Sequence, residues 1–373
     1  MQEHVFCAPG RVEIGGNHTD HQRGCVLAAA VNLETRCVAA ANGTDLVRIA
    51  SDGFGETVLD LTDLAQRRDE NGTTAALIRG VAAWFNSKGH PIGGFDGRVS
   101  SEVPVGMGLS SSAAFEVLIG NVFKGLFDAH VSELDVALAG QFAENIYFGK
   151  PCGLMDQAAS SFGGLTMIDF FDPQNPGVTP VSADLDGYVL CVVATGGSHA
   201  DLTGDYAAIP GEMRAIAACF GKEDLRAVDS DEFYSSVGAL RSAGDRAVLR
   251  AMHFFEENKR VAQQAEALNA GDMPEFLKLV TDSGRSSLAY LQNAYSNANP
   301  SKQGLTLALA LCERFLRGDG AYRVHGGGFA GTVLAFVPDC LQEFFSKRMS
   351  DVFGAGCCHF LQVNRDGGRE ILR

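Results

Sequence analysis

The segment from Gly10 to Gln22, GRVEIGGNHTDHQ, concentrates groups that bind ligands and move protons near the start of the chain. It holds one arginine, two acidic residues and two histidines among three glycines, and the apolar run CVLAAAV begins at Cys25. Polar groups at this density beside a buried segment indicate the rim of a pocket. His18 and Asp20 offer a donor and acceptors, which are the groups that discriminate among the hydroxyls of a polar ligand.

A second candidate is the loop PVGMGLSSSAAFE, from Pro104 to Glu116. Two glycines remove side chains where a backbone must approach a ligand, and three serines then lead into an expected helix. A helix N-terminus carries N–H groups and partial positive charge that bind phosphate, and serine hydroxyls add contacts to phosphate or Mg²⁺. The simpler alternative is a glycine turn with a serine capping the helix.

Two other nucleotide-binding patterns are disfavoured. The chain contains no GxxxxGK[ST], so it lacks the common phosphate loop. The segment GGGFAG, from Gly326 to Gly331, fits GxGxxG, but the following TVLAFV reads as a strand. A dinucleotide fingerprint requires a helix after the glycines, so a glycine-rich hairpin is the better interpretation.

The elements that must position these residues are strands and helices mixed without a regular βαβ repeat, which favours an α+β fold. In the first half we expect a strand VFCAPGRVEIGG broken at Pro9 and Gly10, and separate strands CVLAAAV and TRCVAAA. Helices are expected for SSSAAFEVLIGNVFKGLFDA, SELDVALAGQFAENIYFG, ending at Gly149, and LMDQAASSFG.

A Pro-, Asp- and Gly-rich stretch, DPQNPGVTPVSADLDG, suggests a domain boundary near residue 180, giving domains 1–180 and 181–373. In the second half YVLCVVATG is an expected strand, and residues 204–317 are mostly helical in pattern. A small sheet should follow from YRVHGGG, TVLAFV and HFLQV.

Composition sets the broad class. The chain has 373 residues, 46% of them hydrophobic and 20% charged, as in a soluble protein of two domains. A net charge of −15 argues against nucleic-acid or anionic-membrane partners. Ten cysteines lack metal-type pairs, and Cys37 and Cys191 read as core residues. With no signal peptide or membrane span evident, we expect a cytoplasmic protein that is a monomer or weak homodimer.

Four segments in order resemble the GHMP kinases, the superfamily of galactokinase, homoserine kinase, mevalonate kinase and phosphomevalonate kinase. GRVEIGGNHTDH is similar to the galactokinase signature, PVGMGLSSSAAFE to the shared ATP-phosphate loop, and RVHGGGFAGTVLAF to the C-terminal glycine motif. AENIYFGKPCGLMDQ resembles the galactokinase segment that carries the catalytic aspartate. The resemblance implies a two-domain fold with an active site in the inter-domain cleft, and phosphoryl transfer from ATP to the anomeric hydroxyl of a sugar, most simply D-galactose.

The resemblance also implies roles for individual residues. Asp156 would be the catalytic carboxylate, with Arg11 beside it to keep it ionised. Ser112 and Glu144 would hold Mg²⁺, which favours hard oxygen ligands and substrate phosphates. The ATP-binding residues would be Gly106, Gly108, Leu109, Ser110, Ser111 and Ser112, and the sugar would contact Asn17, His18, Asp20, Gly153 and Tyr206.

Each role has an alternative when the residue is taken alone. Asp156 could be a helix-start acid favoured by the helix dipole, and Glu144 could lie on a solvated helix face. Glu116, on the helix after the serine loop, is a rival metal ligand. His18 and His21 could form a metal pair, but no third ligand is evident.

The chain departs from the galactokinase signature at three positions. That signature usually has asparagine at Glu13, glutamate at Asn17, where it contacts the sugar's C6 hydroxyl, and tyrosine at His21. A neutral Asn17 removes repulsion from a C6 carboxylate, a protonated His21 would attract one, and the DHQ ending resembles plant galacturonokinases. A galacturonate kinase is therefore the main alternative. A non-catalytic sugar sensor on the same scaffold is a third hypothesis, disfavoured by the intact serine loop and Asp156.

Overall fold

The computed structural model describes residues 2–182, 185–197 and 202–371. The chain forms two compact units, each assembled from separate stretches. Unit 1 contains residues 1–11, 29–164 and 363–373, and unit 2 contains residues 12–28 and 165–362. The single domain boundary expected near residue 180 remains a prediction.

A mixed sheet forms the frame of unit 1, with the strand order β12-β1-β2-β5-β3-β4. Strand β3 runs parallel to β5 and antiparallel to β4. Strands β1 and β2 each continue from one unit into the other. The strands are β1 (His4–Gly15), β2 (Cys25–Ala41), β3 (Leu46–Ser51), β4 (Gly55–Asp60), β5 (Phe95–Ser101) and β12 (Arg369–Ile371).

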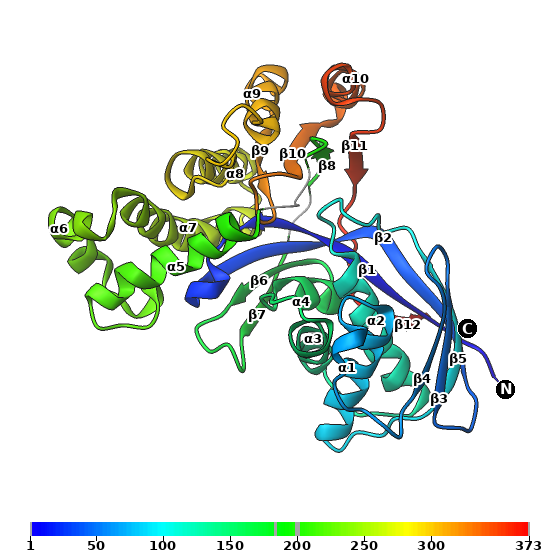
Figure 1. Cartoon of the computed structure of the whole chain (residues 1–373). Coiled ribbons are helices and arrows are strands. Elements are labelled where there is room, and N and C mark those ends of the chain that lie inside the picture. Colours follow the sequence, from blue (N-terminus) through cyan, green and yellow to red (C-terminus); the bar gives the residue numbers. More distant parts are fainter. Residues whose placement is uncertain (1, 183–184, 198–201, 372–373) are drawn as a thin grey trace. The chain divides into compact units, whose positions relative to one another are not determined.

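Helices cover one face of this sheet (Figure 1). They are α1 (Thr74–Ser87), α2 (Ser111–Leu126), α3 (Glu133–Phe142) and α4 (Met155–Phe162). Their apolar faces meet the inward side chains of the strands in one core, in which Phe85, Phe95 and Phe123 are fully buried. As expected, the helix after the serine loop is apolar on most sides and deeply buried, which anchors the N-terminus of α2.

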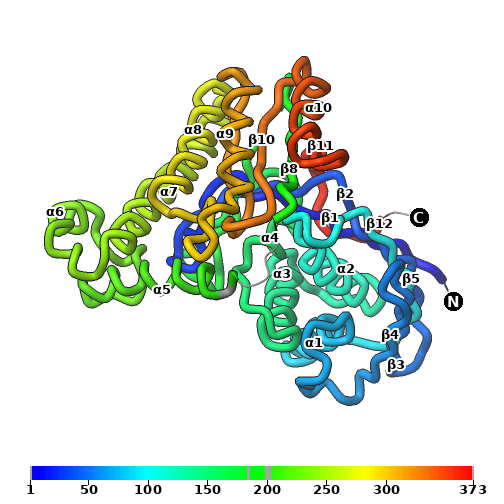
Figure 2. Tube along the Cα trace, turned by 45° about the horizontal axis from the view of Figure 1, so that its top comes forward, coloured from blue at the N-terminus to red at the C-terminus, as the bar shows by residue number. Residues whose placement is uncertain are grey.

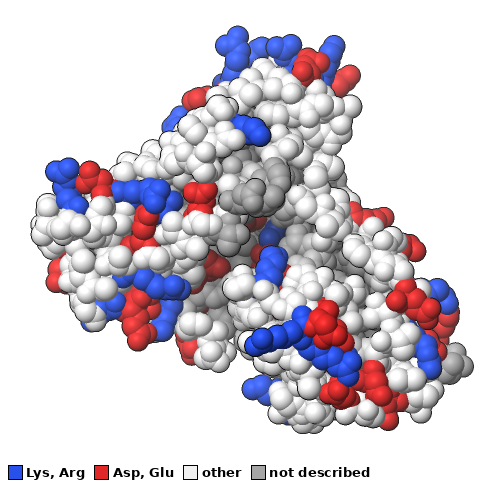
Figure 3. Space-filling model, viewed as in Figure 1, with Lys and Arg blue, Asp and Glu red and all other residues white. Residues whose placement is uncertain are grey.

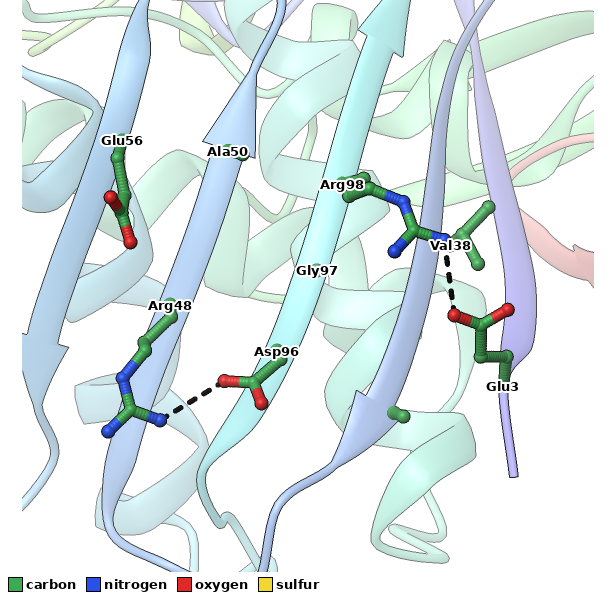
Figure 4. A pocket seen from close by; sticks show the side chains of 9 residues that line it. Glu3, Val38, Arg48, Ala50, Glu56, Asp96, Gly97 and Arg98 are labelled. Carbon is green, nitrogen blue, oxygen red and sulfur yellow. Dashed lines mark hydrogen bonds and ion pairs between the residues drawn. The ribbon is translucent and has the colours of Figure 1, made fainter. Parts of the chain in front are cut away.

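The sheet also bears a hollow, and Figure 4 shows the side chains that line it. Small side chains, such as Ala40 and Ala50, leave a cavity of about 450 Å³. Exposed ion pairs flank it, Arg48 with Asp96 at 3.2 Å and Arg98 with Glu3 at 3.1 Å. None of the predicted site residues lines this hollow.

The expected breaks in the first two strands are absent. Strand β1 passes through Pro9 and Gly10 without interruption, because the φ of proline suits an extended chain. At Arg11 the backbone N–H bonds to the carbonyl of Leu109 at 3.1 Å. The expected strands CVLAAAV and TRCVAAA are one strand, β2, since the residues between them contain no glycine or proline.

The second expected helix changes its winding before it ends. After α3 the chain forms a π-helical turn over Ala143–Phe148, and Gly149 ends it with a φ of +82°. The predicted stop at Gly149 is therefore confirmed. The π-helical turn carries Glu144, and such turns are frequent at functional sites.

Unit 2 contains a second sheet with the antiparallel order β11-β8-β10-β9, which confirms the small sheet expected from the sequence. Strands β9 and β10 pair with His325 opposite Thr332, so the glycine segment between them is a hairpin, as predicted. Figure 2 shows α9 (Gly304–Leu316) beside β10. The strands are β8 (Tyr188–Ala194), β9 (Ala321–His325), β10 (Thr332–Pro338) and β11 (Cys358–Leu361), with β6 (Leu165–Asp169) and β7 (Gly177–Val181) joining β2 in the larger sheet.

The middle of the chain is helical, as expected. Two apolar clusters organise it: one joins α5, α6 and α7, and the other packs α9 and α10 on the small sheet, with Cys191 in its interior. The helices are α5 (Thr203–Cys219), α6 (Ser230–Leu240), α7 (Asp245–Asn269), α8 (Met273–Ser286), a π-helical turn (Ser287–Leu291), α9 (Gly304–Leu316) and α10 (Gln342–Phe353).

The surface carries charges of both signs. On the face shown in Figure 3, acidic and basic side chains lie intermixed over the described residues. Among the described helices, none combines the length and apolar character needed to cross a bilayer.

The C-terminal segment of unit 1 packs against α4. Gly368 donates its N–H to the carbonyl of Ser160 at 2.9 Å, and Gly164 donates to the carbonyl of Asn364 at 2.8 Å. A Cβ atom added to Gly367 would collide with the carbonyl oxygen of Ser161. This close approach requires glycine at position 367.

We therefore expect Gly367→Ala to destabilise the protein by about 1–3 kcal/mol, the usual cost of overpacking. Chemical denaturation measures the change. Gly238→Ala, within α6 and with open space around the new Cβ, is the matched control and should be neutral or slightly stabilising. Equal stability of the two variants would contradict the close packing described for Gly367.

Candidate active site

A bidentate ion pair joins β1 to the start of α4. Arg11 donates from Nε to Asp156 Oδ1 at 2.7 Å and from Nη2 to Oδ2 at 2.6 Å. Ser110 donates to the same Oδ2 at 2.6 Å. Burial works to raise the pKa of Asp156, but the charge and hydrogen bonds of Arg11, with Ser110, outweigh it and lower that pKa. The carboxylate is therefore ionised at neutral pH, as the sequence predicted for this pair.

The glycine-serine loop lies against the same arginine. Gly106 and Gly108 have φ values of +80° and +74°, which glycine adopts without strain. The Arg11 guanidinium donates to the carbonyl of Gly108. Ser110 stands at the N-cap of α2 with a φ of +58°, but its hydroxyl makes no capping bond. The alternative of a capping serine is thus wrong for Ser110, whose hydroxyl donates a hydrogen bond to Asp156 instead.

A pair of buried carboxylates lies beside the first turn of α2. Glu144 is 1% exposed and Glu116 is 0% exposed. Gln157 Nε2 bridges them, donating to Glu116 Oε2 at 2.8 Å and to Glu144 Oε2 at 2.9 Å. Ser112 and Lys150 bond to Glu144 Oε1 at 3.0 Å and 2.8 Å. The alternative that Glu144 lies on a solvated helix face is therefore wrong.

Glu116, the second carboxylate of this pair, has few partners that offset the cost of burying its charge. Burial, and next the charge of Glu144, raise the pKa of Glu116 well above its ordinary value. Its Oε1 atom is buried without a hydrogen-bond partner. Two carboxylates and a serine hydroxyl are the hard oxygen donors that Mg²⁺ prefers, so this chain's residues fit the metal. Among the described residues no group of three or more His, Cys, Asp or Glu side chains is arranged to hold a metal ion.

In unit 2, His18 follows the end of β1 and meets the glycine hairpin. Its φ is +58°, and its Nε2 lies 3.0 Å from the carbonyl oxygen of Gly327. Tyr206, on α5, donates its hydroxyl to the carbonyl of Gly328 at 2.9 Å. A Cβ on Gly327 would lie 2.5 Å from the Tyr206 ring, so the hairpin needs glycine there. The structure thus brings two predicted sugar-binding residues to one hairpin.

The two histidines are neutral at physiological pH. Burial lowers the pKa of His18 to about 4. Burial, and then the neighbouring His18, lower the pKa of His21 well below its ordinary value. The condition under which His21 would attract an acidic sugar, a protonated ring, is therefore not met, because desolvation penalises the charged form.

Asn17 is fully buried, and partners of the chain itself occupy its side chain. Asp20 is partly exposed in a short 3-10 turn, Asp20–Gln22. Gly153 is exposed in the loop before α4, in unit 1.

Several residues of both clusters were not singled out from the sequence. Lys150 donates to Glu144, and Gln157 donates to Glu116. In unit 2, Arg323 donates to Glu13, and Asn293 donates to the Gly327 carbonyl of the hairpin. Gln157 directly follows Asp156, so the MDQ triplet contained a signal for it. Arg323 and Asn293 lie far along the chain from the segments that they contact, and no local pattern indicates them.

Solved structures share this fold. A galactokinase of Lactococcus lactis complexed with galactose matches with a TM-score of 0.84 at 24% identity, covering 99% of this chain and 95% of that chain. The mevalonate kinase of Methanococcus jannaschii matches with a TM-score of 0.68 at 15% identity, covering 97% and 98%. These identities support the α+β fold alone. Residues 76–164 match the GHMP kinases N terminal domain, so the fold and the serine loop define a GHMP kinase, which uses ATP.

The family follows from sequence identity. Residues 1–41 match the galactokinase galactose-binding signature. Over 346 residues the chain is 31% identical to a galactokinase of Actinobacillus pleuropneumoniae, covering 92% of this chain and 88% of that relative. The chain belongs to the galactokinase family and is an ATP-dependent sugar kinase.

The buried carboxylate pair predicts an unusual effect of pH on stability. Because folding raises the pKa of Glu116, the folded state binds an extra proton, and stability falls as pH rises above the ordinary glutamate value of 4.5. Glu116→Gln removes this loss, so it should raise the melting temperature at pH 8 by roughly 2–4 °C and have little effect near pH 4.5.

Thermal unfolding without Mg²⁺ or ATP measures this difference. Glu56→Gln, an exposed glutamate on β4, is the control and should leave the melting temperature unchanged at both pH values. A Glu116→Gln protein that is less stable than the parent at pH 8 would show that Glu116 is held by a cation instead.

Proposed function

We propose that this protein transfers the γ-phosphoryl group of ATP to the anomeric hydroxyl of D-galactose, giving galactose 1-phosphate. The observation that carries this proposal is the Arg11–Asp156–Ser110 cluster, set at the N-terminus of α2 beside the glycine-serine loop. The cluster combines an ionised carboxylate with a site suited to phosphate, as phosphoryl transfer requires. The names of the relatives suggest galactose as the acceptor.

Asp156 and Arg11 form the proposed catalytic pair. As the bond from the sugar oxygen to the γ-phosphorus forms and the bond to the bridging oxygen breaks, Asp156 accepts a hydrogen bond from the sugar hydroxyl and takes its proton. Arg11 keeps the carboxylate ionised and aims both of its oxygens. Because three hydrogen bonds already lower the basicity of Asp156, we propose that orienting the hydroxyl is the larger part of its role.

The proposed phosphate site is the loop with the first turn of α2. Backbone N–H groups there and the helix dipole would bind the phosphates, with the hydroxyls of the three serines nearby. The residues are Gly106, Gly108, Leu109, Ser110, Ser111 and Ser112.

Ser112 and Glu144 are the proposed ligands of Mg²⁺, and Glu116 lies behind them with its unpartnered oxygen. When bound, the metal neutralises charge on the transferring phosphates. The ammonium group of Lys150 donates to Glu144 Oε1. We propose that it moves to a phosphate when the metal binds.

For the sugar we propose contacts from His18, Asp20, Gly153 and Tyr206. His18 is neutral with a fixed tautomer, because its Nε2 must carry the proton that bonds to the Gly327 carbonyl. The donor is thus in use, and Nδ1, 3.4 Å from His21 Nε2, is the acceptor that we propose takes a hydrogen bond from the sugar hydroxyl in place of His21.

The alternatives are weaker. A galacturonate kinase drew support from the neutral Asn17, from the DHQ ending and, if protonated, from His21; burial keeps the His21 ring neutral and so removes the last of these. A non-catalytic sensor would not need the ion pair of Arg11 with Asp156, which is intact.

The substrate is tested by ADP release with Mg-ATP and a panel of galactose, galacturonate, N-acetylgalactosamine, arabinose and glucose. We expect the highest kcat/KM for galactose, by about tenfold or more over each other sugar, since one lost hydrogen bond in a polar site costs on the order of 1.4 kcal/mol. A higher kcat/KM for galacturonate would replace the proposed substrate, and binding of sugar and ATP without turnover would revive the sensor.

The catalytic pair is tested with Arg11→Gln. The pKa of Asp156 lies below its ordinary value of 3.8, so its carboxylate stays ionised to a lower pH than a free aspartate would. In the parent protein, activity should therefore be lost only below the ordinary pKa. Without Arg11 burial dominates, the pKa of Asp156 rises, and the acid limb of the kcat/KM profile should move to higher pH. We also expect kcat to fall by roughly 10²–10³-fold.

The measurement is a pH profile of kcat/KM for both proteins. Arg98→Gln, on the outer face of β5 and paired only at the surface, should keep the parent profile. An Arg11→Gln profile with an unmoved acid limb would show that another group keeps Asp156 ionised.

A further inference from the structure

Asn17 is the centre of a buried hydrogen-bond network in unit 2. Its amide nitrogen donates to Glu13 Oε1 at 2.9 Å and to the Gly326 carbonyl at 2.7 Å. Its carbonyl oxygen accepts from Asn293 at 2.8 Å and Ser287 at 3.3 Å. An asparagine side chain has two N–H donors and two acceptor positions, so all four are in use.

The charge in this network is balanced by one ion pair. Arg323, on β9 and 0% exposed, donates from Nη2 to Glu13 Oε1 at 2.6 Å, and Glu13 is 4% exposed. The position of Asn17 therefore requires a neutral donor. A carboxylate there would face the carboxylate of Glu13 and would turn an acceptor toward the Gly326 carbonyl, both of which are costly in a buried site.

The network extends to the glycine hairpin and the residues that rest on it. Asn293 donates to the Gly327 carbonyl at 3.2 Å, and the same carbonyl bonds to His18 Nε2. The main-chain carbonyl of Asn293 accepts a hydrogen bond from the Phe329 N–H. Tyr206 donates its hydroxyl to the main-chain carbonyl of Gly328, the next residue of the hairpin. Asn17 thus fixes the hairpin on which both His18 and Tyr206 depend.

Helix α7 holds the backbone of the same segment. His253, fully buried, places Nε2 2.9 Å from the Asn17 carbonyl, and its Nδ1 lies 2.8 Å from Ser286 Oγ. Glu257, also fully buried, accepts from the Gly16 N–H at 3.0 Å. The main chain and the side chain of Asn17 are therefore both fixed by the protein.

We infer that Asn17 is a positioning residue, coupled to Glu13 as one amide–carboxylate pair, and that it orients the sugar-binding residues without contacting the sugar. This inference rests on the proposed function for its kinetic test. A direct sugar contact would require Asn17 to give up one of its four internal bonds. The two departures at positions 13 and 17 then act together, placing the single carboxylate where Arg323 neutralises it.

The first test compares Asn17→Ala with the parent protein on galactose and on its 2-deoxy, 4-deoxy and 6-deoxy analogues. A residue that contacts one hydroxyl loses nothing on the analogue without that hydroxyl. A positioning residue loses the same factor on every sugar. We expect a fall in kcat/KM of at least tenfold that is equal, within about threefold, across the four sugars. Full retention on one analogue would overturn the inference.

Asn293→Ser keeps the test decisive if Asn17→Ala does not fold. Asn293 is not among the proposed sugar ligands, yet it bonds to both Asn17 and Gly327. The inference requires the same uniform loss in this variant, and a loss confined to one analogue would overturn it. Asn121→Ala, a buried amide of α2 in unit 1 that bonds within its own helix, controls for loss of a buried amide and should keep the parent activity.

The second test needs no substrate and separates the inference from the proposed function. Asn17→Asp places two carboxylates together, Glu13→Gln removes the partner of Arg323, and the double variant restores one carboxylate and one amide. We expect each single variant to lower the melting temperature by several degrees and the double variant to recover at least half of the Asn17→Asp loss. Losses that simply add would overturn the coupling, whereas an inactive parent protein with clear recovery would refute only the proposed function.

Discussion

Burial of charge beside its counter-charge is the constraint on which both units depend. β1 carries Arg11 and Glu13 two residues apart, and in a strand such residues point to the same face. Arg11 belongs to unit 1 and pairs with Asp156, while Glu13 belongs to unit 2 and pairs with Arg323. Each charge would be costly to bury alone, so the partner positions are as constrained as the motif itself.

The glycine segments are a consequence of these pairs. The guanidinium of Arg11 reaches the Gly108 carbonyl, and the network of Glu13 and Asn17 reaches the Gly326 carbonyl. Carbonyl groups can be approached this closely because both segments adopt positive φ values that expose them. The first glycine motif is thus bonded by Arg11 of β1, and the second by Asn17, which follows the end of that strand.

Much of this was predictable from local sequence and some was not. The buried helix after the serine loop, the stop at Gly149 and the late hairpin follow from apolar runs and glycines, which act over a few residues. The pairing of Arg11 with Asp156 came only from the resemblance to a family. The hydrogen bonds of Ser110 to Asp156 and of Asn17 to Asn293 were not foreseen, because contacts across the fold leave no local pattern. The neutrality of His21 depends on burial, which the sequence around it does not indicate.

The π-helical turn Ala143–Phe148 has an evolutionary consequence. The π turn holds one residue more than an α-helical turn would, directly after the helix that began at Glu133. Each residue of an α-helix advances about 100° around the axis. A deletion that restored the α-helix would swing the flanking side chains by that angle and part Glu144 from Ser112. The number of residues in this turn is therefore as constrained as the identity of Glu144 within it.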